Sequence, residues 1–281
     1  MVPITEFEAA RPRLTALAFR LLGSVHDAED AVQSTWLKAS AADTDGLRNP
    51  AAWLTTVLTR VCLDQLRTRH RRREEPLLAD LLPAETVAAD ERYLRRENIS
   101  RALMVVLGLL TPAQRVAYVL HDLFDVPFRE VAQALGTSAD SAKKHASRAR
   151  RSLAGARPAS TAATVDHAVV EAFLDAAAGG DIGRMVALMT DDCVRVADAT
   201  LLPPGTPEAI TGADAVARET TLFADRIRVG APLLVDGRPV SVIAPGGHPL
   251  AVITVTTRDR RVARIDISRP GDLGAALSAT S

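Results

Sequence analysis

Cysteine is scarce in this chain of 281 residues, where only Cys62 and Cys193 occur. Two cysteines so far apart provide neither a disulfide framework nor the clustered ligands of a zinc site. Their scarcity is typical of a reducing environment, so we expect a cytoplasmic protein. Uninterrupted apolar runs stay well below the roughly 18 residues of a membrane span, and the N-terminus lacks the basic flank and apolar run of a signal peptide. We therefore expect no membrane partner.

Signatures of common enzyme classes are also missing. The sequence contains no glycine-rich phosphate loop, no paired metal ligands and no nucleophile elbow. We therefore predict no catalytic residue, no cofactor and no metal. Net charge is zero, but residues 1–157 hold 23 Lys and Arg against 19 Asp and Glu, and residues 158–281 hold 11 against 15. The N-terminal part therefore suits an anionic partner and the C-terminal part does not.

Three amphipathic helices are predicted in the first 73 residues. Apolar residues recur with helical spacing over residues 7–22 and 26–40, and Gly23-Ser24 separates the two segments. A third helix begins at Pro50, after a polar loop, and ends in five arginines within residues 67–73. Fewer than five cations are enough to stabilise the negative end of a helix dipole, so the arginines favour a phosphate-binding edge.

Residues 74–91 combine prolines with leucines, which indicates a linker that docks on an apolar surface. Further helices are predicted over residues 91–110 and 113–124. The stretch from Pro127 to Leu153 then reads as two short helices joined at Gly136, a residue suited to a left-handed helix end. Alanines recur along one side of the second helix, and basic residues lie on the other side. This pattern is typical of a helix-turn-helix, although a solvated basic hairpin would share it.

The pattern changes after Val165. Two helices are predicted over residues 166–178 and 181–189, then a strand over 193–197 and a helix over 213–223. Three alternating apolar runs follow over residues 239–243, 250–256 and 262–267, with hairpin-like turns between them. Helices followed by an antiparallel meander predict an α+β domain.

The first 157 residues resemble an extracytoplasmic-function (ECF) sigma factor of bacterial RNA polymerase. DAEDAVQSTWLKA at Asp27–Ala39 is similar to the family's polymerase-binding helix, and WLTTVLTRVCLDQLR at Trp53–Arg67 resembles its −10 helix. LTPAQRVAYVLHDLFDVPFREVAQALG at Leu110–Gly136 and RAR at Arg148–Arg150 resemble its −35 domain. Arg60 departs from the family's usual asparagine, and RVCLDQLR is similar to the SigJ-type subgroup.

The C-terminal part resembles the extra domain of that subgroup. LMTDDCVRVAD, ITGADAVAR, VDGRPV and DISRPGDL are similar to a SnoaL-like domain, a cone of the nuclear-transport-factor type. Arg269 and Gly271 replace the usual Asn and Asp of the family's NPDKL tail, and Asp272 replaces Lys. DLLPAE at Asp80–Glu85 aligns with a WLPEP-like signature but lacks its Trp. The fold expected is therefore multidomain: two all-α sigma domains, the second with a helix-turn-helix, and then an α+β cone.

The resemblance implies a division of labour. Sigma region 2 is expected at residues 1–73, a linker at 74–100, region 4 at 101–156, a second linker at 157–165 and the regulatory cone at 166–281. The partners implied are core RNA polymerase, through its β′ clamp helices and β flap, and promoter DNA. Contacts with core polymerase are expected at Asp27, Glu29, Asp30, Gln33 and Trp36. Contacts with the −10 element are expected at Thr55, Thr56, Thr59, Arg60 and Arg67, with the threonines and Arg60 exposed, and contacts with the −35 element at Lys143, Lys144, Ser147, Arg148 and Arg151. Regulatory contacts between domains are expected at Leu81, Leu82, Pro83, Arg269, Pro270, Asp272 and Leu273.

Two alternatives stay open at this point. The cone could bind a small molecule or catalyse a reaction, with Asp198, His248 and Asp266 as the nearest candidates, although each has a structural interpretation as well. The chain could also be an ordinary repressor, but a repressor needs only the helix-turn-helix and not the polymerase-binding and −10 segments.

Overall fold

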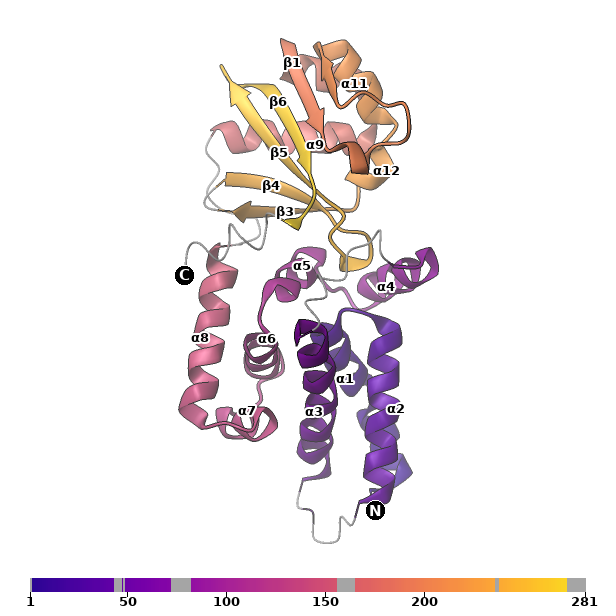
Figure 1. The fold of residues 1–281 in the computed structure, drawn as a ribbon, viewed down its shortest axis with the longest axis vertical. Coiled ribbons are helices and arrows are strands. Elements are labelled where there is room, and N and C mark those ends of the chain that lie inside the picture. The colour runs from indigo at the N-terminus through magenta and orange to yellow at the C-terminus, as the bar shows by residue number, and fades with distance from the viewer. Residues whose placement is uncertain are drawn as a thin grey trace. The chain divides into compact units, whose positions relative to one another are not determined.

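The computed structural model describes residues 2–42, 47, 49–71, 82–155, 165–235 and 238–271. The chain divides into two compact units, which are described separately. Unit 1 spans Met1–Leu77 and Leu81–Leu153, and unit 2 spans Leu78–Asp80 and Ala154–Ser281. The described part of unit 1 is helical, and unit 2 combines helices with a sheet (Figure 1).

Unit 1 begins with three long helices: α1 (Ile4–Leu22), α2 (Val25–Ala41) and α3 (Pro50–Arg71). They pack against one another and bury the apolar stripes that the sequence predicts. Gly23 ends α1 in the left-handed region, with φ of 86°, and its N–H donates to the carbonyl of Phe19. The predicted break at Gly23-Ser24 is confirmed.

The helix predicted over residues 91–110 is wrong, because two helices occupy this region. Helix α4 (Ala84–Arg96) starts within the predicted linker, and α5 (Arg101–Leu109) follows. Asn98 lies between them with φ of 51°, a conformation that asparagine adopts more readily than most residues. The hydroxyl of Ser100 then caps α5 by accepting from the N–H of Leu103 at 3.4 Å.

The rest of unit 1 contains α6 (Pro112–Tyr118), a π-helical turn η2 (Val119–Leu123), α7 (Phe128–Leu135) and α8 (Ala139–Gly155). Gly136 ends α7 with φ of 68°, and Ser138 caps α8 by accepting from the N–H of Ser141 at 3.2 Å. Ala142, Ala146 and Ala149 are fully buried along α8. The predicted helix-turn-helix geometry is confirmed.

Unit 2 is an α+β fold, as expected. Its elements are α9 (Val165–Gly179), α10 (Ile182–Leu188), β1 (Met189–Ala197), η3 (Ala199–Leu201), β2 (Ala209–Thr211), α11 (Ala213–Thr221), α12 (Ala224–Ile227), β3 (Gly230–Val235), β4 (Arg238–Ile243), η4 (Pro245–Gly247), β5 (Ala251–Arg258) and β6 (Arg261–Ser268). The strands form one sheet in the order β2-β1-β6-β5-β4-β3 (Figure 1). Helices α9 and α11 pack on this sheet over a core that includes Phe173, Val216 and Ile265.

The sheet contains the strands that the sequence predicts and also strands that it does not predict. Strands β4, β5 and β6 form the predicted antiparallel meander, and Asp259 and Arg260 take left-handed φ angles in the turn between the last two. Strands β2 and β3 were not predicted, and β1 pairs with β6 in parallel. A three-residue strand such as β2 has no periodicity of its own, and a parallel pairing joins segments remote in sequence.

Both thiols are buried and free. Burial raises the pKa of Cys62 to about 12 and that of Cys193 to about 11, so neither is a thiolate at neutral pH. Every helix in the described residues falls short of the length and apolar character of a membrane span. The same residues contain no group of His, Cys, Asp and Glu side chains that could hold a metal ion.

Candidate functional site

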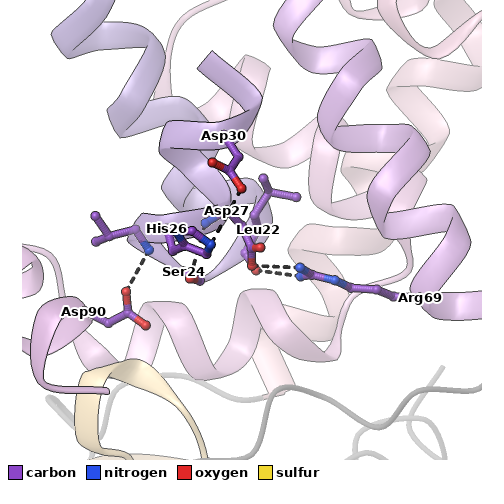
Figure 2. A network of polar contacts seen from close by, with 8 residues as sticks. Leu22, Ser24, His26, Asp27, Asp30, Arg69 and Asp90 are labelled. Carbon is purple, nitrogen blue, oxygen red and sulfur yellow. Dashed lines mark hydrogen bonds and ion pairs between the residues drawn. The ribbon is translucent and has the colours of Figure 1, made fainter. Parts of the chain in front are cut away.

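The N-terminal turn of α2 is held by contacts from three other parts of unit 1 (Figure 2). The Ser24 hydroxyl accepts from the N–H of Asp27 at 3.5 Å, and an Asp90 oxygen on α4 accepts from the N–H of Val25 at 2.7 Å. Arg69 on α3 donates to the Asp27 carboxylate at 2.7 Å and to the carbonyl of Leu22 at 3.3 Å. Asp27 therefore ties α2 to α3, which is a positioning role that the sequence did not indicate.

The outward face of α2 carries the other acidic residues. Glu29, Asp30 and Gln33 are exposed, and among the described residues Asp30 forms one ion-pair contact, at 3.7 Å with the exposed His26. Leu37 lies on the same face by helical spacing and is 62% exposed, a residue that sequence reasoning missed. The sequence does contain a signal for this exposed residue, because Leu37 is an isolated leucine that lies outside the apolar stripe of the helix. Trp36 instead packs against the core, with its ring 4.9 Å from that of Phe7.

A hollow of about 570 Å³ lies beside this face, between α1, α2 and α4. Its lining includes Glu29 and the buried Tyr93, whose ring lies 5.1 Å from the guanidinium of Arg96. Burial raises the pKa of the Tyr93 hydroxyl, so it remains protonated at neutral pH. The arginines and glutamates of the lining are Arg11, Arg92, Arg96, Glu29 and Glu97.

The predicted −10 face of α3 is less open than the sequence indicates. Thr59 is fully buried, which contradicts the expectation that it is exposed, and its hydroxyl donates to the carbonyl of Thr55 at 2.7 Å. The hydroxyls of Thr55 and Thr56 also donate to carbonyls four residues earlier. Arg60 is exposed and donates to the carbonyl of Gln133 on α7 at 3.0 Å. Arg67 is exposed.

The predicted −35 residues share one surface of α8. Their side chains are exposed, whereas the alanine stripe on the opposite side is buried. Among them, only Lys143 forms a described ion pair, a 3.6 Å contact with the exposed Asp140. The basic surface consists of Lys143, Lys144, Ser147, Arg148 and Arg151.

Arg150 differs from its neighbours on α8. Its guanidinium donates to the carboxylate of Asp122 on η2 at 2.6 Å, and Asp122 is mostly buried. This ion pair anchors the basic helix to the rest of the helix-turn-helix. A phosphate contact by Arg150 would compete with it.

The three candidate catalytic residues of the cone are Asp198, His248 and Asp266, and local contacts or burial account for each of them. Thr200 donates two hydrogen bonds to Asp198 and holds its pKa below the usual value, so this carboxylate is charged at neutral pH. Asp266 pairs with Arg264 at 2.7 Å, on the sheet face opposite to the buried Ile265. His248 is buried after the η4 turn.

The residues predicted to regulate between domains are only partly described. Leu81, Asp272 and Leu273 lie outside the described residues. Leu82 is half-buried, Pro83 precedes α4 and Pro270 is buried. Arg269 donates to the Thr200 hydroxyl at 3.0 Å within unit 2.

Two family models match the helical part of the chain. Sigma-70 region 2 matches residues 7–72, and Sigma-70, region 4 matches residues 100–153. The first match contains the outward face of α2 and the predicted −10 face of α3. The second contains the whole helix-turn-helix and the basic surface of α8.

Two proteins of Mycobacterium tuberculosis are similar over most of the chain. The ECF RNA polymerase sigma factor SigJ is 42% identical over 226 residues, which cover 76% of this chain and 71% of SigJ. The probable ECF RNA polymerase sigma factor SigI is 31% identical over 195 residues, 65% of each chain. The crystal structure of SigJ aligns with 98% of this chain and 99% of its own, at 32% identity and a TM-score of 0.44.

Proposed function

The chain belongs to the extracytoplasmic-function RNA polymerase sigma factors, and on this premise we propose that it binds core RNA polymerase and directs initiation at promoters of defined sequence. The observation that carries the proposal is the exposed basic surface of α8, backed by a buried alanine stripe within a region 4 helix-turn-helix. Such a helix can enter the major groove and present its early residues to base edges.

The division of labour follows the predicted domains. Residues 1–73 contact the polymerase and the −10 element, residues 101–156 read the −35 element and contact the β flap, and residues 74–100 and 157–165 are linkers. The outward face of α2 supports a clamp-helix contact at Glu29, Asp30 and Gln33, because these side chains are exposed on a helix whose first turn is held in place. The ion pair between Asp27 and Arg69 gives Asp27 a positioning role, because it holds that face of α2 in place.

Reconstituted transcription tests the proposal. Full-length protein and core polymerase are incubated with a library of randomised promoters, and the transcripts are sequenced. We expect initiation from a subset of promoters that shares two sequence elements. Absence of initiation from every promoter, with core polymerase that is active with another sigma factor, would contradict the proposal.

Arg148 and Arg151 on α8 should differ in what they recognise. Arg148 lies earlier in the helix, so Arg148→Ala should weaken binding by about 1–3 kcal/mol and relax selectivity at one −35 position. Arg151 lies near the helix end, so Arg151→Ala should weaken all promoters alike and reduce the salt dependence. Binding to promoter variants at several salt concentrations measures both effects. Identical sequence profiles and salt slopes for the two variants would refute this division of roles.

We also propose that the C-terminal cone, residues 166–281, regulates the sigma factor in cis. A tether of about ten residues would hold the cone at an effective concentration on the order of millimolar, so even a weak contact would be mostly formed. The regulatory contact is proposed at Leu81, Leu82 and Pro83 in the first linker and at Arg269, Pro270, Asp272 and Leu273 in the tail.

Two truncations test the regulatory role. Ending the chain after Ala156 removes the cone, and ending it after Ile267 removes the tail together with Ser268, the last residue of β6. We expect at least one truncation to change transcription several-fold without changing the preferred −35 sequence. Equal transcription by all three proteins over a range of concentrations would exclude regulation in cis. The alternative of an enzymatic or ligand-binding cone gains no support from Asp198 or Asp266, because both carboxylates are engaged in local contacts.

A further inference from the structure

Helix α8 (Figure 1) carries a single acidic residue, Asp140, and all its other charged residues are basic. Asp140 lies in the first turn, and its side chain is 84% exposed. Among the described residues its ion-pair partner is Lys143, at 3.6 Å, whose side chain is 59% exposed. Exposed ion pairs contribute little to stability, so the carboxylate can exchange this contact for another one.

Asp140 lies on the side of α8 that faces away from the protein core. It begins a stripe that continues through Lys144, Ser147 and Arg151, at spacings of four, three and four residues. The first three members of the stripe each lie two positions before one of the fully buried alanines. Two residues turn a helix by about 200°, so the stripe runs opposite the alanines. The carboxylate therefore shares the surface of the predicted −35 contacts.

The N-terminal cap of α8 comes from Ser138 and not from Asp140. The Ser138 hydroxyl accepts from the N–H of Ser141 at 3.2 Å and donates to the Ser141 hydroxyl at 3.0 Å. A carboxylate in the first turn also favours the positive end of the helix dipole. That effect requires an acidic residue in the first turn but does not require it on the outward stripe, so the dipole leaves this position of Asp140 unexplained.

DNA interacts differently with the carboxylate of Asp140 and with the cations beside it. Phosphates repel a carboxylate and attract lysine and arginine. In the major groove, cytosine presents its N4 amino group as a donor, whereas guanine and thymine present acceptors. Adenine presents a donor beside an acceptor, which suits an amide better than a carboxylate. A carboxylate on a helix that lies in the major groove therefore favours cytosine over the other three bases.

We propose that Asp140 is a specificity-determining residue of the −35 contact, which accepts a hydrogen bond from the N4 amino group of cytosine at one base pair. The inference rests on the proposed function, because it requires α8 to enter the major groove with its first turn at the base edges. Repulsion from the acceptors of guanine and thymine is the second part of this role. Asp140 thus lowers the affinity for incorrect sequences, whereas Lys144 and Arg151 on the same stripe raise the affinity for DNA.

Selection of random double-stranded DNA by the full-length protein, with and without core polymerase, tests this role. The bound DNA is sequenced for the wild type, Asp140→Ala and Asp140→Asn. The wild type should prefer cytosine at one −35 position by about tenfold. Asp140→Ala should reduce this preference to less than about twofold and raise the affinity for unrelated sequences about twofold to fivefold, because a negative charge is removed. Asp140→Asn should prefer adenine at the same position, since an amide pairs with its N6 and N7 atoms.

A double variant separates base recognition from helix stabilisation. Asp140→Ala combined with Ser141→Asp keeps a carboxylate in the first turn of α8 but moves it about 100° around the helix. It should not recover the cytosine preference. If Asp140→Ala weakens binding to all sequences alike and the added Ser141→Asp restores it, the role of Asp140 is structural and the inference is overturned. Asp140→Asn has nearly the same shape as the wild type, so its change to adenine is decisive even if Asp140→Ala is unstable.

The remaining outcomes distinguish this inference from the proposed function. An unchanged base preference in both Asp140→Ala and Asp140→Asn overturns the inference, and so does a wild type that selects no sequence. Failure of the wild type to initiate transcription from the selected DNA contradicts the proposed function instead. In that case the base preferences of the bound DNA still decide the role of Asp140.

Discussion

Replacing Glu29 and Asp30 together by lysine should weaken the binding of core RNA polymerase about a hundredfold or more. Both carboxylates are exposed on the outward face of α2, and the first turn beneath them is fixed by Ser24, Asp90 and Arg69. A charge reversal there should convert an attraction into a repulsion without disturbing the helix. Competition for core polymerase against a labelled sigma factor measures the loss.

A matched control makes the same change in net charge within unit 2 instead of on this face. Asp214→Lys with Asp225→Lys places the same charges on exposed helix positions of unit 2 and should leave core binding unchanged. Leu37→Ser extends the test to the apolar residue on the same face. Loss of the leucine side chain should weaken the binding of core polymerase if the polymerase contact continues along α2. Core binding that withstands the double reversal would place the polymerase contact elsewhere.

Asp27 should behave differently from its two neighbours. Its carboxylate accepts from Arg69 and is mostly buried, so Asp27→Ala should lower the stability of unit 1 as well as core binding. A substitution that acts through position should be partly rescued by Asp27→Asn, which can still accept from Arg69. The Glu29 and Asp30 variants should show no change in stability.

Glu219→Ala should destabilise unit 2 by about 3–5 kcal/mol. Its carboxylate binds Arg195, which is only 2% exposed and also donates at 3.0 Å to the carbonyls of Pro207 and Glu208. Removing the carboxylate leaves a buried guanidinium without its counter-charge, which is more costly than losing an exposed ion pair. Scanning calorimetry of the full-length protein measures the effect.

Two comparisons make this prediction specific. Both tryptophans lie in unit 1, so their fluorescence should report an unchanged transition there while the calorimetric transition of unit 2 shifts. Asp266→Ala removes an exposed partner of Arg264 in the same unit and should cost less than about 1 kcal/mol. Equal losses for Glu219→Ala and Asp266→Ala would show that burial of Arg195 does not determine its contribution.

The predictions that succeeded depended on local chemistry. The alanine stripe of α8 follows helical periodicity, Gly136 takes the left-handed angle that ends α7, and residues 258–261 form a tight turn between alternating strands. Each of these features is decided by a few neighbouring residues. The resemblance to ECF sigma factors rests on motifs of the same kind, and the matches to regions 2 and 4 confirm it.

The predictions that failed required knowledge of remote neighbours. Apolar periodicity continues through residues 91–110, but the chain turns at Asn98 and α4 reaches back to cap α2 through Asp90. Thr59 is polar and was expected at the surface, yet it is buried in a unit where α7 packs on α3. Polarity predicts exposure only for a face that no other helix covers.

The amino-acid sequence by itself determined the family, the helix-turn-helix and the basic surface of α8, because side-chain spacing along a helix is sufficient to place them. Only the tertiary structure decided which charged side chains are available to contact a partner molecule or solvent. Asp27, Arg60, Arg150 and Arg195 look equally free in the sequence, but each is engaged by a group 24 to 73 residues away. An arginine contacts a partner or solvent according to what packing brings near it, and that information is not local.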